Sequence, residues 1–139
     1  MRYWDSSAVV PLLVHQPTSA RTDRWLADDP AVSLWTLTPV EITSALWRLV
    51  RDGTVQEADA QRAESRALEL AAASYTVADV EAVKALARRL LRVHTLRAAD
   101  ALQLGAALVW ASGRPQGKTL HTLDERLALA ARREGFEVP

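Results

Sequence analysis

The sequence predicts an α/β fold in which a mostly parallel sheet is covered by helices on both faces. Short β-prone runs alternate with longer segments of helical spacing along the 139 residues, as in strand–helix–strand units. Residues 98–110 are apolar on nearly every side of the helix that they predict, which is typical of a buried helix. The chain length and the absence of a linker-like stretch predict one domain over residues 1–139.

The first elements follow from local signals. Asp5 or Ser6 is the expected N-cap of the first helix, and Thr18 or Ser19 that of the second. We expect, in chain order, a strand at 2–4, a helix over 5–14, a helix over 18–29 and a strand over 31–36.

The next helix, expected over 38–53, carries the most complete set of signals. Thr38 is a cap residue, Pro39 takes the first helical position, and Gly53 marks the end. Glu41 follows Thr38 by three residues, as in a capping box. The later elements are expected as a helix at 56–73, a strand at 74–77, helices at 79–94 and 98–110, a strand at 119–122, a helix at 123–135 and a last strand at 136–138.

The composition excludes several kinds of site. The chain has no cysteine, which rules out disulfides, thiolate zinc sites and a cysteine nucleophile. Lys and Arg together number 17, as do Asp and Glu, so the whole molecule does not attract nucleic acid, although an acidic centre can cancel a basic rim. We find neither a signal peptide nor a membrane-spanning stretch, and the expected location is the cytoplasm.

Acidic residues that are distant in the sequence fall at equivalent positions of the predicted sheet. Asp5 closes the first strand, Glu41 lies in the first turn of the helix after the second strand, and Asp124 directly follows the 119–122 strand. Ligands of such folds collect beyond the carboxyl ends of the strands. Asp100 lies near the start of the buried helix, and we expect all four acids to meet in one pocket.

Each acid taken alone also has a purely structural explanation. Asp5 can cap a helix, and Asp100 can be satisfied by Arg97 or by backbone amides. Only the set of four therefore carries information. Two capping boxes are also expected, Thr38 with Glu41 and Thr122 with Glu125.

Four converging carboxylates need a counter-charge. Two carboxylates about 4 Å apart repel by roughly 4 kcal/mol at the effective dielectric near a protein surface. The sequence supplies no obvious internal cation, and hard oxygen ligands without Cys or a paired His motif favour Mg²⁺ or Mn²⁺ over Zn²⁺. A carboxylate-held pair of such ions is a known device for phosphodiester cleavage, because it activates water and stabilises the leaving oxygen.

Further residues support this interpretation more weakly. Ser6 and Thr122 lie beside the acids, where their hydroxyls bond either to ligand oxygens and metal waters or to helix ends. Arg97 and Arg126 lie within a few residues of a predicted ligand and are the candidates for phosphate contacts. The three histidines, His15, His94 and His121, are not at metal-ligand spacing.

Several motifs in one order resemble the PIN-domain family, and most closely the VapC-type toxins of bacterial type II toxin–antitoxin pairs. The similarity runs from Arg2 to Val138. Two departures are Gln103, where many relatives have His, and Gly105, where Ala is common. The motifs are D-S-S at 5–7, T-P-x-E at 38–41, L-R-A-A-D-A-L-Q-L at 96–104, T-L-D-E-R-L at 122–127 and A-A-R-R-E-G at 130–135.

This resemblance implies a three-layer α/β/α sandwich with a central, mostly parallel sheet. It also implies an endoribonuclease that depends on Mg²⁺ or Mn²⁺ and a cognate antitoxin that blocks its acidic pocket. The expected assembly is a homodimer or a toxin–antitoxin hetero-oligomer, with RNA as substrate and no membrane. The family's acidic site, both catalytic and metal-binding, falls on Asp5, Glu41, Asp100 and Asp124.

A second class of function also uses an acidic Mg²⁺ pocket on a parallel sheet, namely a non-catalytic, receiver-like signalling or scaffold domain. Such a domain would want an acidic pair after the first strand and a lysine before proline. Here 5–7 contains one acid, and Lys118 precedes Thr119. We therefore rank this alternative below the nuclease.

Overall fold

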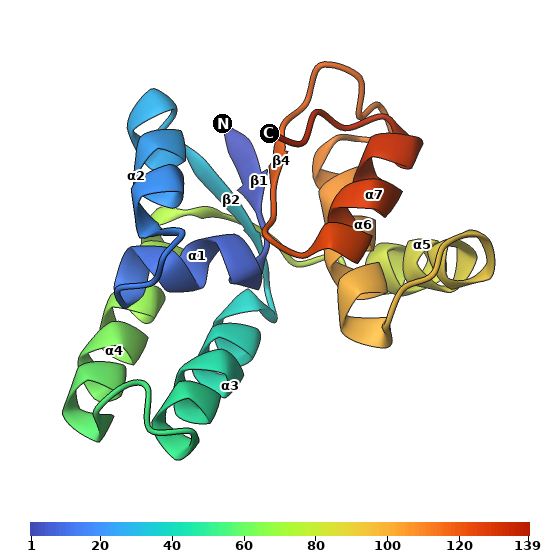
Figure 1. Ribbon diagram of the computed structural model, residues 1–139. Helices are drawn as coiled ribbons and strands as arrows, with labels where there is room; N and C mark the ends of the chain where they lie inside the picture. Colours follow the sequence, from blue (N-terminus) through green and yellow to red (C-terminus); the bar gives the residue numbers. More distant parts are fainter.

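The computed structural model describes all residues, 1–139, and contains a four-stranded parallel sheet (Figure 1). In space the strands follow the order β3-β2-β1-β4, so β1 is central and pairs in parallel with β2 and β4. The predicted parallel sheet is confirmed, and its strands end at a common edge. The strands are β1 (Arg2–Trp4), β2 (Val32–Trp35), β3 (Tyr75–Val77) and β4 (Leu120–His121).

Helices cover the sheet on both sides. Figure 1 shows α1 to α4 on one side of the strands and α5 to α7 on the other. Most helix ends lie within one or two residues of the expected positions. The helices are α1 (Ser6–Leu13), α2 (Ser19–Asp28), α3 (Thr38–Arg51), α4 (Glu57–Ala73), α5 (Val80–Val93), α6 (Ala98–Trp110) and α7 (Glu125–Glu134).

Alternation along the strands divides the apolar side chains between two cores. Tyr3 and Trp35 pack with residues of α5, α6 and α7, whereas their neighbours Trp4 and Leu34 pack with residues of α1 to α4. Successive strand residues point to opposite faces of a sheet, so two buried faces require apolar residues at every position. The two cores on one sheet confirm the three-layer α/β/α sandwich.

Helix signals were accurate where a single residue determines the end. The Asp5 side chain caps α1 by accepting from the Ala8 amide, as expected. Gly53 follows α3 with φ +81°, and Gly135 ends α7 with φ +108°, both in the left-handed region that favours glycine. Thr18 is the N-cap residue of α2, as one alternative expected, but its side chain forms no capping hydrogen bond, and the Ser19 hydroxyl donates to the Pro11 carbonyl.

The strand predicted at 136–138 is wrong. Glu137 forms one isolated parallel bridge with Thr119, and no further residue pairs extend this bridge into a strand. The Val138 carbonyl accepts from the Arg132 guanidinium. None of the helices is both long and apolar enough to cross a membrane.

Candidate active site

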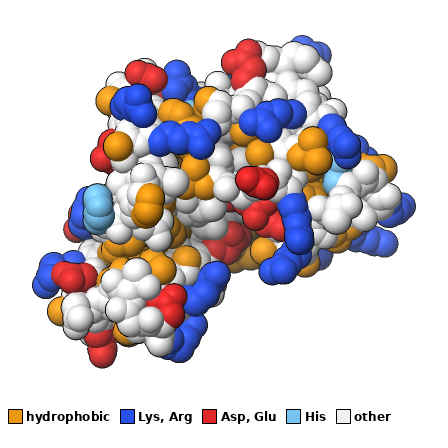
Figure 2. Space-filling model, viewed as in Figure 1, with side chains coloured by type: hydrophobic (Ala, Val, Ile, Leu, Met, Phe, Trp, Pro, Cys, Tyr) orange, Lys and Arg blue, Asp and Glu red, His pale blue; other side chains and the backbone are white.

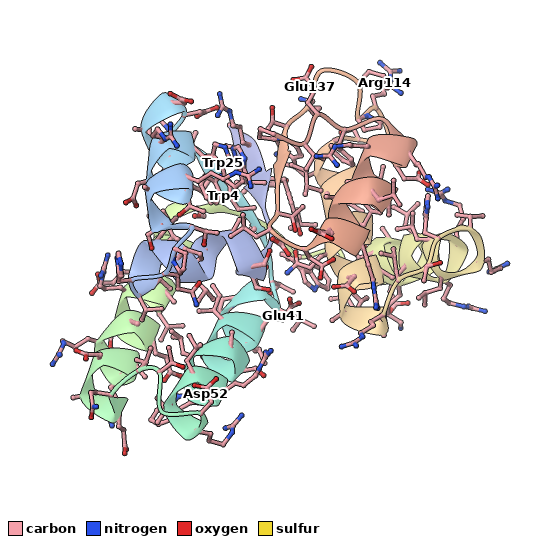
Figure 3. All side chains as sticks on the ribbon, viewed as in Figure 1. Trp4, Trp25, Glu41, Asp52, Arg114 and Glu137 are labelled. Atoms are coloured by element: carbon pink, nitrogen blue, oxygen red, sulfur yellow. The ribbon has the colours of Figure 1, made fainter.

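The four predicted acids lie at the carboxyl edge of the sheet. Asp5 directly follows β1, Glu41 is in the first turn of α3 after β2, Asp100 is in the first turn of α6, and Asp124 is the residue before α7. Figure 2 shows acidic side chains gathered in a recess at the centre of this face, with basic side chains beside them. Figure 3 places Glu41 at the sheet end of α3, between the two groups of helices.

Asp5 is the most deeply buried of the four, with 4% of its surface exposed. Its Oδ1 accepts from the Ser7 hydroxyl at 2.8 Å and from the Ala8 amide at 3.3 Å. Burial raises the pKa of Asp5 to about 7, these hydrogen bonds lower it, and the charge of Glu41 adds a smaller increase. Asp5 therefore serves as a helix cap and, with a pKa of about 7, is only partly ionised at neutral pH.

Glu41 does not form the predicted capping box. The Thr38 hydroxyl accepts from the Trp35 amide at 3.2 Å, and Leu37 occupies the N-cap position without a side-chain bond. The Glu41 side chain is thus released from the helix end. Its Oε2 accepts from the Ser6 hydroxyl at 3.0 Å and from Nε2 of Gln103 at 3.1 Å. A capping box therefore does not explain the presence of Glu41 at this position.

Burial is also the largest influence on Glu41 and raises the pKa of its carboxyl. The two hydrogen bonds oppose this effect, and the charge of Asp100 adds to it. The pKa of Asp100 is raised as well, first by burial and then by the charge of Asp124. Electrostatic effects therefore connect each acid to the next along the edge.

Asp100 and Asp124 both have one backbone partner. The Arg97 amide donates to Oδ2 of Asp100 at 3.3 Å, so a backbone amide does satisfy one oxygen, as one alternative expected. Oδ1 of Asp124 accepts from the Leu127 amide at 2.8 Å and caps α7. The capping box between Thr122 and Glu125 is wrong, since the Thr122 hydroxyl instead accepts from the Asp124 amide at 3.0 Å.

The acids share one edge without forming a closed metal shell. No ion pair involves any of the four. As placed, no three His, Asp or Glu side chains come close enough together to hold a metal ion. The donor chemistry nevertheless fits a hard divalent cation, because the carboxylates lie close enough to perturb one another and have no side-chain cation as a partner.

Hydroxyl and amide groups complete the site. Ser6 donates to Glu41, as described above. The hydroxyls of Thr122 and Ser7 are joined by a hydrogen bond of 3.2 Å. Ser7 also accepts from the Leu123 amide at 2.8 Å. Ser7 and Gln103 were missed as site residues. Ser7 gave no separate signal, whereas Gln103 was the other strongly polar residue of an apolar helix and follows Asp100 by one helical turn.

The two predicted phosphate contacts lie exposed at the rim of the site. Arg97 and Arg126 both lower the pKa of Asp100 through their charge, and neither forms an ion pair. Their contact with phosphate stays a prediction.

A groove of about 670 Å³ lies between α1 and α3, and Glu41 is the one of the four acids that lines it. Ser6, Ser7 and Glu41 form its inner end, and Ser44 and Arg48 lie on its α3 side. Apolar side chains complete its lining. The site thus opens into a space large enough for a nucleotide-sized group.

Two curated relatives match nearly the whole chain. Ribonuclease VapC45 from Mycobacterium tuberculosis (strain CDC 1551 / Oshkosh) is 34% identical over 137 residues, which cover 98% of this chain and 92% of that protein. Ribonuclease VapC49 from M. tuberculosis (strain ATCC 25618 / H37Rv) has the same identity and coverage. No protein-family model matches the sequence.

Solved structures share the fold. PAE2754 from Pyrobaculum aerophilum has a TM-score of 0.62 at 24% identity, covering 94% of this chain and 79% of its own. FitAcB from Neisseria gonorrhoeae has a TM-score of 0.64 at 20% identity, covering 99% and 96%. FitAB bound to an IR36 DNA fragment has a TM-score of 0.66 at 20% identity, covering 100% and 94%.

Proposed function

The chain belongs to the VapC ribonuclease family, and we propose that it is a divalent-metal-dependent endoribonuclease that acts as the toxin of a toxin–antitoxin pair. Residues 1–139 act as one PIN domain in this proposal. The observation that carries it is the gathering of four carboxylates, from four separate segments of the chain, at one edge of the sheet without a side-chain cation among them.

Asp5, Glu41, Asp100 and Asp124 are the residues that would hold Mg²⁺ or Mn²⁺. Such an ion supplies a metal-activated water and stabilises negative charge on the phosphate and leaving oxygens. The buried Asp5 supports this assignment most strongly, since its pKa of about 7 makes the ionised form costly until a cation lies beside it.

The protein's own groups position the reacting atoms. Ser6 and Gln103 fix Glu41 by hydrogen bonds, and Ser7 and Thr122 brace Asp5 and the start of α7. Arg97 and Arg126 contact the RNA phosphates beside the scissile bond, where exposed guanidinium groups suit phosphate geometry. The groove between α1 and α3 receives the adjacent part of the RNA.

We also propose the partners of this protein, which membership of the VapC family supports. A cognate antitoxin covers the acidic site and blocks it, and the free toxin is a homodimer. The solved FitAB structure shares this fold, and at 20% identity the similarity concerns the fold alone.

Cleavage of RNA by the purified, antitoxin-free protein tests this function. We expect cleavage with Mg²⁺ or Mn²⁺ and none with EDTA, and we expect Asp5→Asn and Asp100→Asn to lose cleavage. Arg88→Gln, on the outer face of α5, is the matched control and should retain it. Full activity in both aspartate variants would end the proposal.

A further inference from the structure

Gln103 lies at the centre of a buried hydrogen-bond chain that ends on Glu41. Only 1% of its surface is exposed. Its Nε2 donates to Oε2 of Glu41 and to the Thr38 hydroxyl, both at 3.1 Å, and its Oε1 accepts from the Tyr3 hydroxyl at 2.7 Å. These hydrogen bonds therefore connect β1, α6 and the start of α3 through one side-chain amide.

The carboxylate of Glu41, which only accepts hydrogen bonds, determines which end of this amide faces it, because the Tyr3 hydroxyl can donate or accept. The Tyr3 hydroxyl is buried and donates to Oε1, which leaves the NH₂ group for the carboxylate. In the reversed orientation the amide oxygen would face Oε2 of Glu41, and two acceptors would meet without a proton between them. The orientation of Gln103 is thus set by Glu41, and the Tyr3 hydroxyl holds the other end of the amide by donating to Oε1.

Both donors to Glu41 converge on one oxygen. The Ser6 hydroxyl and the Gln103 amide donate to Oε2, whereas Oε1 receives no hydrogen bond from the protein. A carboxylate held by two bonds on one oxygen has a fixed plane, and its other oxygen is available to the reacting groups.

The amide is not needed for packing. Gln103 is the one polar residue among the buried residues of α6, and a buried amide costs free energy unless its hydrogen bonds are made. We propose that Gln103, held at its far end by Tyr3, is a positioning residue that holds Glu41 with Oε1 free for the reaction. This inference rests on the proposed nuclease function.

Steady-state cleavage of RNA provides the first test. Gln103→Met keeps the size of the side chain and removes both polar ends, and we expect kcat to fall about 10–100-fold, as for other residues that orient a metal ligand, with KM nearly unchanged. Tyr3→Phe should give a smaller loss in kcat. Leu104→Met changes an equally buried side chain at the neighbouring position and controls for the effect of a new side-chain shape in the core. Its kcat should stay within about 2-fold of the original value. Unchanged kcat in folded Gln103→Met would overturn the inference.

A spectroscopic test does not depend on activity. The side-chain NH₂ resonances of Gln103 are followed in ¹⁵N-labelled protein, and we expect them to shift in both Glu41→Gln and Tyr3→Phe. Unchanged resonances in both variants would overturn the inference, even if kcat falls in Gln103→Met. If the unmodified protein cleaves no RNA, the nuclease proposal fails, whereas the resonances still decide the positioning role. The same holds if Gln103→Met does not fold.

Discussion

At the scale of single residues, Asp5 combines a structural and a chemical demand. It caps α1 and is buried, with a pKa of about 7 against 3.8 in an unfolded chain. The folded state holds the proton up to about pH 7, so the contribution of Asp5 to stability is present at low pH and is lost as the pH rises through 7.

Asp5→Asn should therefore stabilise the metal-free protein at pH 8. Asn can still cap the helix and carries no charge, so we expect a gain of roughly 1–4 kcal/mol in the free energy of unfolding, shrinking towards pH 4. Urea denaturation in EDTA at pH 5 and pH 8 measures the difference. An Asp5→Asn protein less stable than the original at pH 8 would contradict this account of the buried carboxylate.

His121 predicts the opposite response to acid. Its ring is buried between Trp4 and Trp25, with ring centroids 4.5 Å from both, and neither ring nitrogen has a hydrogen-bond partner. Burial lowers its pKa to about 4, so the unfolded chain takes up a proton below about pH 6.5 and the folded chain does not. His121 thus contributes stability that is lost as the pH falls from 6.5 to 4.

His121→Phe should remove this loss. We expect the variant to gain roughly 1–3 kcal/mol relative to the original protein between pH 6.5 and pH 4. Thermal unfolding across this range measures the effect. A stability difference that stays the same at both ends of the range would show that the imidazole is not the group responsible.

The sequence could predict which acids matter but not how each is held. Spacing suggested capping boxes for Thr38 and Thr122, yet the Thr38 hydroxyl accepts from the amide of Trp35, at the end of β2, and the Thr122 hydroxyl from that of Asp124. Such choices depend on tertiary neighbours, here Gln103 and Ser7, which no local pattern contains. The hydrogen bond from Ser6 to Glu41 agrees with one of the two roles expected for the Ser6 hydroxyl, a bond to a carboxylate oxygen of the site.

At the scale of elements, the packing of α5 on α6 depends on Gly105. A Cβ added there would lie 3.0 Å from the Val83 carbonyl oxygen and 3.4 Å from the Ala87 nitrogen, both in the α5 backbone. The close approach of the two helices explains why this chain has glycine.

Gly105→Ala should consequently destabilise the protein. Alanine favours a helix by about 1 kcal/mol, but the backbone of α5 would have to move to make room, and overpacking of this kind costs about 1–3 kcal/mol. We expect a lower midpoint in thermal unfolding. A higher midpoint would show that α5 shifts at little cost.

Element types and order followed well from periodicity, because strands and helices here have distinct apolar spacing. The prediction of a last strand at 136–138 was wrong. Glu137 forms a single bridge, and its partner Thr119 is distant in the sequence. Strand pairing of so few residues is a tertiary property.

At the scale of the whole molecule, the parallel sheet explains how distant acids meet. Parallel strands end at one edge, so the residues after β1, β2 and β4 become neighbours although about 120 residues separate Asp5 from Asp124. The sequence predicted that these acids share one edge of the sheet. It also predicted that all four meet in one pocket, whereas only Glu41 lines the groove between α1 and α3 and no three of the acids come close enough to hold a metal ion.

Binding of Mn²⁺ or Mg²⁺ should stabilise the folded protein. At 100 times the dissociation constant, a ligand of the folded state adds about 2.7 kcal/mol, and the unmodified protein should therefore unfold at a higher temperature with the ion. Asp100→Asn should show a smaller increase, and Glu81→Gln, an exposed acid on α5, the full increase. Equal increases in all three proteins would place the ion elsewhere.

The most direct measurement is anomalous X-ray diffraction from crystals grown with Mn²⁺. We expect a manganese peak at the sheet edge, bound by oxygens of Asp5 and Asp100 and, directly or through water, of Glu41 or Asp124. Well-diffracting crystals with no peak there, or with manganese bound only at other residues, would contradict the proposal that these four acids form one metal site.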